Sequence, residues 1–91
     1  MKKITFIGAG SFDFTRELVR DILTYDALKD ARICLMDIDS QKLGFIEKAC
    51  HKIKEAGKYP VTIEATLDRE KALEGADGVV INILSAGPDI F

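Results

Sequence analysis

The residues best suited to chemistry form a glycine-rich segment near the start of the chain, GAGSFD at residues 8–13. This segment follows a β-prone run and matches the first two glycines of the dinucleotide-binding pattern G-x-G-x-x-G. Gly8 would permit a sharp turn out of the strand, and Gly10, which lacks a Cβ, would let a pyrophosphate approach the backbone at a helix N-terminus. Ser11 adds a hydroxyl and an N–H there. A plain glycine-rich turn is the alternative interpretation.

Three acidic residues qualify this pattern. Asp13 replaces the third glycine, so the helix should start slightly displaced, with the carboxylate turned away from the phosphates or capping the helix. Asp37 stands 24 residues further on (37 minus 13), close to the offset of about 20 at which a carboxylate receives the adenosine ribose hydroxyls. A carboxylate there repels a 2′-phosphate, which favours NAD over NADP. The alternatives are a solvated strand-end residue for Asp37 and a helix cap for Asp39.

Hydrophobic periodicity predicts the elements that must position these residues. We expect strands at 3–7, 32–36, 61–65 and 79–84, an amphipathic helix from Phe14, a second helix capped by Asp39 or Ser40 and stopped by Gly57, and a short helix at 68–75. Because right-handed crossovers turn a βαβ alternation into a parallel sheet, the fold class is α/β, Rossmann-like, with strand order 3-2-1-4.

This order places a crevice between the glycine turn and the loop after the fourth strand. The small or polar residues there would face the nicotinamide half of the cofactor, unless the loop is an ordinary turn: Asn82, Ser85, Ala86 and Gly87. The six-stranded version of the fold has two further strands, so the sheet is expected to be incomplete, with an open edge. Either a partner or a second copy covers that edge, or the sequence is the first part of a longer protein.

Composition limits the partners. The 91 residues are 47% hydrophobic and 31% charged, which is typical of one globular domain spanning 1–91. A net charge of -2 with interspersed signs offers no basic stripe for nucleic acid or anionic lipid, and the apolar runs are too short for a membrane span. We therefore expect a cytoplasmic protein with a small-molecule partner. Cys34 and Cys50 lie in apolar stretches, which indicates reduced core thiols.

Four segments together carry a family resemblance: KITFIGAGS, the helical LVRDIL, LMDID at residues 35–39, and EGADGVVINILSAG at residues 74–87. With these segments the chain resembles the N-terminal part of glycoside hydrolase family 4, most of all its α-galactosidase and α-glucosidase branch, over essentially all 91 residues. That family has a GAGS loop without the third glycine, so the resemblance accounts for Asp13.

The resemblance implies an NAD-dependent route to hydrolysis. The C3 position of the sugar is oxidised, the C2 proton is removed with the help of a divalent metal, usually manganese, the aglycone is eliminated, water adds, and the hydride returns to C3. The phosphate loop would comprise Gly8, Ala9, Gly10, Ser11 and Phe12, and Asp37 would be the ribose acceptor.

The catalytic part of the family does not carry over. Its metal-binding Cys and His and its base lie downstream of Phe91, so the segment alone is expected to be catalytically silent and to hold no metal. The pair Cys50-His51 looks like a ligand pair. However, Cys50 lies on the apolar face of a helix and His51 is turned about 100° away from it.

Two other readings of the sequence stay open. One is a 2-hydroxy-acid dehydrogenase of the lactate or malate type, which more often keeps the third glycine and changes NAD in net turnover. The other is a nucleotide-binding module or fragment without catalytic activity, consistent with a sheet that stops after four strands.

Overall fold

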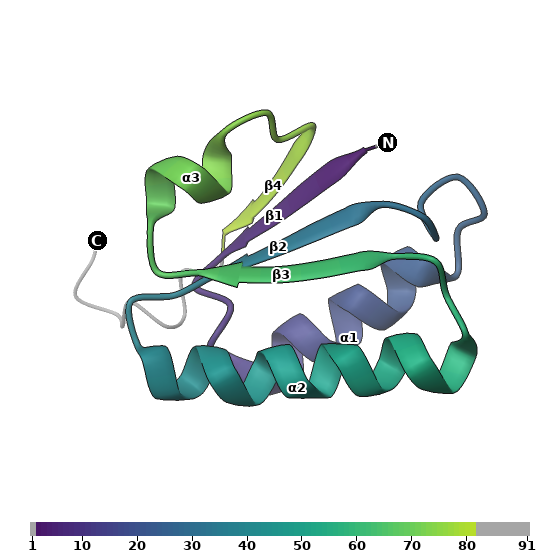
Figure 1. The fold of residues 1–91 in the computed structure, drawn as a ribbon, viewed down its shortest axis with the longest axis horizontal. Helices are drawn as coiled ribbons and strands as arrows, with labels where there is room; N and C mark the ends of the chain where they lie inside the picture. Colours follow the sequence, from purple (N-terminus) through teal and green to yellow (C-terminus); the bar gives the residue numbers. More distant parts are fainter. Residues whose placement is uncertain (1, 82–91) are drawn as a thin grey trace.

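The computed structural model describes residues 2–81. Strands and helices alternate along the chain (Figure 1). In order they are β1 (Lys3–Ile7), α1 (Phe12–Leu23), β2 (Arg32–Met36), α2 (Ser40–Gly57), β3 (Thr62–Thr66), α3 (Arg69–Leu73) and β4 (Gly78–Ile81). Within the described residues, no helix has the length and apolar character needed to span a bilayer.

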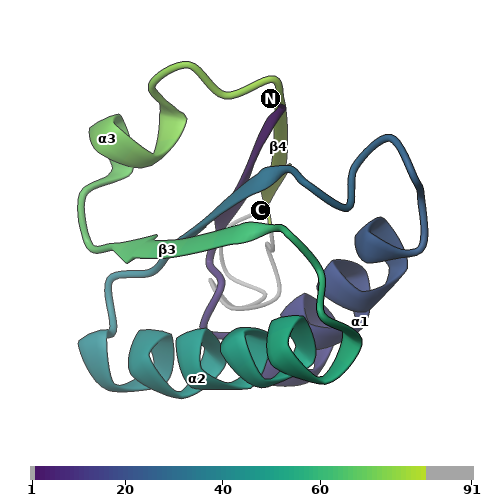
Figure 2. The same cartoon turned by 45° about the vertical axis from the view of Figure 1, so that its right-hand side comes forward.

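All strand pairs are parallel, and the order across the sheet is β3-β2-β1-β4. The predicted fold class and strand order are therefore confirmed. The register pairs Ile7 with Met36 on β2 and with Ile81 on β4, so the segments that follow β1 and β2 leave the sheet side by side. Both views place α1 and α2 on one face of the sheet and α3 on the other (Figures 1 and 2).

The main core lies between the sheet and the pair α1 and α2. Alternate strand residues point into it, including Phe6 of β1 and Leu35 of β2, and they meet Val19 of α1 and Ile46 of α2. These side chains are at most 1% exposed. Burial of a side chain of this size stabilises the fold by about 1.5–3 kcal/mol, so this core fixes both helices against the sheet.

The opposite face is held to α3 largely by polar contacts. Its apolar cluster is small and centres on Cys34, Met36 and Ala72. The Thr5 hydroxyl donates to the Ala72 carbonyl oxygen at 2.5 Å. The ammonium group of Lys3 donates to the carbonyl oxygen of Glu74 at 2.6 Å and to that of Lys71 at 3.2 Å. Buried polar groups of β1 therefore donate to carbonyl groups at and just beyond the C-terminus of this short helix.

The sheet has an open edge, as expected from the sequence. Within residues 2–81, β4 pairs with β1 alone, and its Val79 and Ile81 are 44% and 63% exposed. Whether a second copy of the chain covers this edge stays a prediction. The expected end of the strand, from residue 82 on, lies outside the described residues.

Several predicted boundaries need correction. The first helix begins at Phe12 rather than Phe14, and the ends of β3, the ends of α3 and the start of β4 differ from the prediction by one to two residues. Gly57 is the last residue of α2 rather than its stop, because the left-handed residue is Lys58, with φ of 53°. Gly57 has a different role: a Cβ there would collide with the ring of Tyr59. A close contact with a ring two residues further along the chain therefore requires the glycine, and hydrophobic periodicity does not reveal it.

Thr5→Val tests the polar attachment of α3. Valine keeps the shape of the side chain but removes the hydroxyl, which leaves the Ala72 carbonyl without its donor. We expect the free energy of unfolding to fall by about 1–2 kcal/mol, measured by urea denaturation followed by circular dichroism. Thr62→Val, at an exposed position of β3, is the control and should change stability little. Equal effects of the two substitutions would contradict a special role for Thr5.

Candidate functional site

The glycine turn bends sharply across the end of β2. Gly8 has φ of 79°, a left-handed conformation that suits glycine. The N–H groups of Gly8 and Ala9 both donate to the Met36 carbonyl oxygen, at 3.0 and 2.9 Å, and Ser11 N donates to Gly8 O at 3.3 Å. The role predicted for Gly8 as the turn residue is confirmed, and the turn is tied directly to the end of the neighbouring strand.

Asp37 lies next to this turn and is buried. One carboxylate oxygen, Oδ2, accepts the Gly10 N–H at 2.7 Å, and the other, Oδ1, accepts the Asp39 N–H at 2.9 Å. The residue is only 7% exposed, so the alternative of a solvated strand-end residue is wrong. Asp37 is held by backbone donors on two sides, which fixes the direction of its carboxylate. Its contact with a ribose stays a prediction.

Gly10 is partly buried, and the side on which a Cβ would stand faces Asp37 and Lys42, a contact that the sequence did not predict. A Cβ on Gly10 would lie 2.7 Å from Oδ2 of Asp37 and 2.9 Å from Cβ of Lys42. The missing side chain of Gly10 thus makes room for the carboxylate of Asp37. The approach of a pyrophosphate to Gly10 stays a prediction. Lys42 was not among the predicted site residues. The available signal was its position in the first turn of α2, a turn without an acidic residue.

The N-terminus of α1 differs from those of the other two helices. Asp39 caps α2 by accepting from the N–H groups of Gln41 and Lys42, and Asp68 caps α3 in the same way. Ser11, at the N-cap of α1, makes no side-chain capping bond. Within the described residues no side chain therefore competes for the first N–H groups of α1, which are donors suited to an anion.

The residues on either side of Ser11 differ in exposure and in their contacts. Of the two predicted alternatives for Asp13, the cap is wrong, because Ser11 is the N-cap residue and the side chain of Asp13 is 88% exposed, with an ion pair of 3.7 Å to Arg16. Phe12 is 38% exposed, and Ala9 is buried at 1%. The hydroxyl of Thr15 donates to the Ala9 carbonyl oxygen at 2.9 Å and further holds the turn.

The other half of the predicted crevice lies outside the described residues. This applies to all four residues that were expected to face the nicotinamide: Asn82, Ser85, Ala86 and Gly87. Within residues 2–81, the structure brings together the glycine turn, Asp37 and Lys42 at the carboxyl ends of β1 and β2.

The cysteines have the character of core thiols. Cys50 is fully buried, and this burial, with a smaller effect of the nearby Glu47, raises the pKa of its thiol to about 12. Burial also raises the pKa of Cys34. His51 lies 3.8 Å from Glu47 on the partly exposed side of α2. Within residues 2–81 no group of three His, Cys, Asp or Glu side chains could hold a metal ion, and Cys50-His51 forms no part of one.

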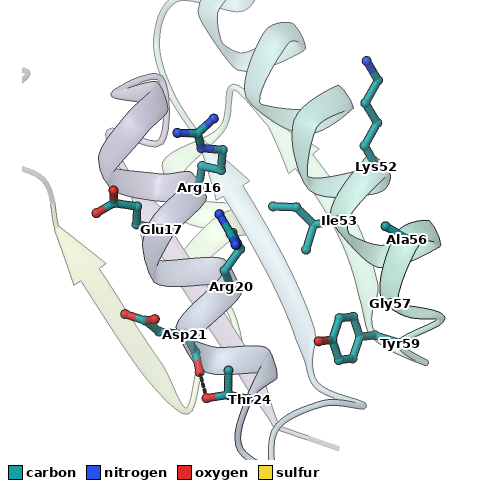
Figure 3. A pocket seen from close by; sticks show the side chains of 10 residues that line it. All are labelled: Arg16, Glu17, Arg20, Asp21, Thr24, Lys52, Ile53, Ala56, Gly57 and Tyr59. Carbon is teal, nitrogen blue, oxygen red and sulfur yellow. Dashed lines mark hydrogen bonds between the residues drawn. The ribbon is translucent and has the colours of Figure 1, made fainter.

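A separate groove runs between α1 and α2, and Figure 3 shows the side chains that line it. It encloses about 790 Å³, with Arg16 and Arg20 of α1 facing Ile53 of α2, and it extends to Thr24 and Tyr59 at the far ends of the helices. Its basic residues are accompanied by Glu17 and Asp21. The groove lies away from the glycine turn and is not part of the predicted crevice.

The sequence and the fold identify the family. The model of family 4 glycosyl hydrolases matches residues 3–88. The chain is 38% identical to an α-galactosidase of Rhizobium meliloti (strain 1021) over 89 residues, covering 98% of this chain and 18% of that protein. It is 37% identical to an α-glucosidase of Erwinia rhapontici over 81 residues, covering 89% and 18%. The chain belongs to glycosyl hydrolase family 4, and it spans about a fifth of the length of these relatives.

Two solved structures share the fold. Both are 6-phospho-α-glucosidases from gut microorganisms, one in complex with NAD and glucose-6-phosphate and the other with NAD and Mn²⁺. Each superposes with a TM-score of 0.78, at 23% and 16% identity. The matches cover 89% and 94% of this chain but 18% and 20% of those chains. At this identity the likeness establishes the arrangement of the helices and strands.

Both thiols should be unreactive in the folded chain. Because burial raises the pKa of Cys34 and of Cys50, each thiol holds less of the reactive thiolate than an ordinary cysteine, which is half ionised at about pH 8.5. We expect no rapid reaction with an aromatic disulfide reagent in buffer, and reaction of both thiols in guanidinium. Cys50→Ala should leave one. Reaction of the folded chain at the rate of a free cysteine would contradict the burial of either residue.

Proposed function

We propose that the chain is the NAD-binding part of a family 4 glycosidase, and that it holds the adenosine half of the cofactor where β1 and β2 end. The observation that carries this proposal is the Asp37 carboxylate, fixed 2.7 Å from Gly10 N beside a helix N-terminus that no described side chain caps. In this arrangement Asp37, which can accept hydrogen bonds from the ribose hydroxyls, lies beside the N-terminus of α1, which can bind the phosphates.

The residues of the turn fit the dinucleotide. The pyrophosphate would lie on Gly8, Ala9, Gly10, Ser11 and Phe12, with the first N–H groups of α1 as donors. A carboxylate has about four acceptor positions, and the bonds from Gly10 and Asp39 use two of those on Asp37. The others can accept the two ribose hydroxyls. When bound, the cofactor would supply hydride transfer through its nicotinamide, and the glycine turn and Asp37 would bind and orient its pyrophosphate and adenosine.

We extend the proposal to a longer protein of which this chain would be the N-terminal part. Its activity would be hydrolysis of an α-galactoside or an α-glucoside by the redox route, with a divalent metal such as manganese. Support comes from the names of the relatives and from the NAD, glucose-6-phosphate and Mn²⁺ in the similar structures. The catalytic residues would be supplied by a domain outside this chain, and residues 1–91 would serve as its cofactor-binding domain.

Calorimetric titration tests the proposal. We expect NAD⁺ to bind saturably and NADP⁺ at least about tenfold more weakly, because the charge of Asp37 repels a 2′-phosphate. Asp37→Ala should weaken NAD⁺ binding by about tenfold or more, the effect of losing hydrogen bonds to a charged group. A folded chain that binds neither dinucleotide would refute the proposal.

The matched control is Asp39→Ala, which removes a helix cap from the same loop but leaves the bond between Asp37 and Gly10. It should reduce stability by about 1 kcal/mol and keep NAD⁺ affinity. Since Asp37→Ala also removes the acceptor of two backbone N–H groups, circular dichroism must first establish that it folds; Asp37→Asn, which keeps one oxygen as an acceptor, replaces it otherwise. Unchanged affinity of a folded Asp37 variant would exclude Asp37 from the site.

A further inference from the structure

Lys42 lies directly against the glycine turn. Its Cβ would be 2.9 Å from a Cβ on Gly10, while Oδ2 of Asp37 would be 2.7 Å from the same point. The carboxylate of Asp37 and the stem of Lys42 thus flank Gly10. The ammonium of a lysine lies at the end of a flexible four-carbon stem, so that of Lys42 can extend past Gly10 toward the N-terminus of α1.

The charge of Lys42 is unfavourably placed for the helix that carries it. Helix N-termini favour acidic residues, because the macrodipole is positive there. The first turns of α1 and α3 follow this rule with Asp13 and Glu70, whereas the first turn of α2 has no acidic residue and contains Lys42. Lys42 is exposed, and among residues 2–81 no salt bridge involves it. The stability of the helix does not account for a cation at this position.

We infer that Lys42 is a positioning residue for the cofactor: its ammonium binds a phosphate group of the dinucleotide held at the glycine turn. The inference rests on the proposed NAD-binding function. Asp37 would take the hydroxyls of the adenosine ribose while Lys42 takes an adjacent phosphate, so the two opposite charges beside Gly10 divide the polar groups of the ligand. The phosphate is either the pyrophosphate, present in NAD and NADP, or the 2′-phosphate, present in NADP alone.

Titration of the full chain with NAD⁺ and with NADP⁺ tests this role. Lys42→Ala should weaken binding about fivefold, the size of a solvent-exposed charge interaction, and Lys42→Arg should restore it to within about twofold. The loss should shrink in about 0.5 M NaCl, where the Debye length falls to a few ångströms. The control is Lys58→Ala, an exposed lysine that follows the C-terminal end of α2, far along the helix from the glycine turn, and it should bind as the unmodified chain does.

The possible results distinguish a wrong role for Lys42 from a wrong NAD-binding function. Weaker binding of both dinucleotides by Lys42→Ala assigns Lys42 to the pyrophosphate, and weaker binding of NADP⁺ alone assigns it to the 2′-phosphate. Unchanged affinity for both, in a chain that binds NAD⁺, overturns the role of Lys42 and leaves the NAD-binding function standing. If the unmodified chain binds neither dinucleotide, both fail together. Lys42 is exposed, and in the described part of the chain its ammonium takes part in no salt bridge, so its variants should melt like the unmodified chain.

Discussion

The hydrogen bond from Gly10 N to Asp37 Oδ2 is the contact on which the candidate site depends. It joins the loop after β1 to the loop after β2, two segments brought together by the parallel pairing of Ile7 with Met36. With any side chain at position 10, its Cβ would lie 2.7 Å from Asp37 Oδ2, so the carboxylate could not come this close. The start of α1 is set by the same loop, so one contact orders Asp37, the glycine turn and a helix N-terminus relative to each other, and these are the three parts of the proposed dinucleotide site.

The sequence predicted best those elements whose limits are local. Strands β1 and β2 match the prediction residue for residue, because each is a compact apolar run ended by an unambiguous signal, Gly8 or Asp37. The strand order also followed, since right-handed crossovers leave few alternatives. The end of α2 did not, because Gly57 is required by the ring of Tyr59 and not by the backbone conformation of the helix end. Contacts of that kind have no periodic trace in a sequence.

The site shows the same division. Residue type and spacing pointed to the glycines and to Asp37, because a phosphate turn and a ribose acceptor need those residues at about those positions. They did not reveal that Asp37 already binds Gly10 N, or that Lys42 lies against the turn, since these contacts join residues 27 and 32 positions apart (37 minus 10 and 42 minus 10). Only the packing of α2 beside the turn brings them together.

The arrangement also sets how much a ligand must reorganise. A carboxylate already fixed by Gly10 and Asp39 loses little conformational freedom when a ribose arrives, and such preorganisation raises affinity by lowering the cost of binding. The same bonds make Asp37 part of the fold, so its replacement changes stability and binding together. Lys42 lies against the turn with the base of its side chain, and within residues 2–81 no salt bridge holds its ammonium. A substitution of Lys42 should therefore change ligand affinity without changing the stability of the domain, whereas a substitution of Asp37 changes both.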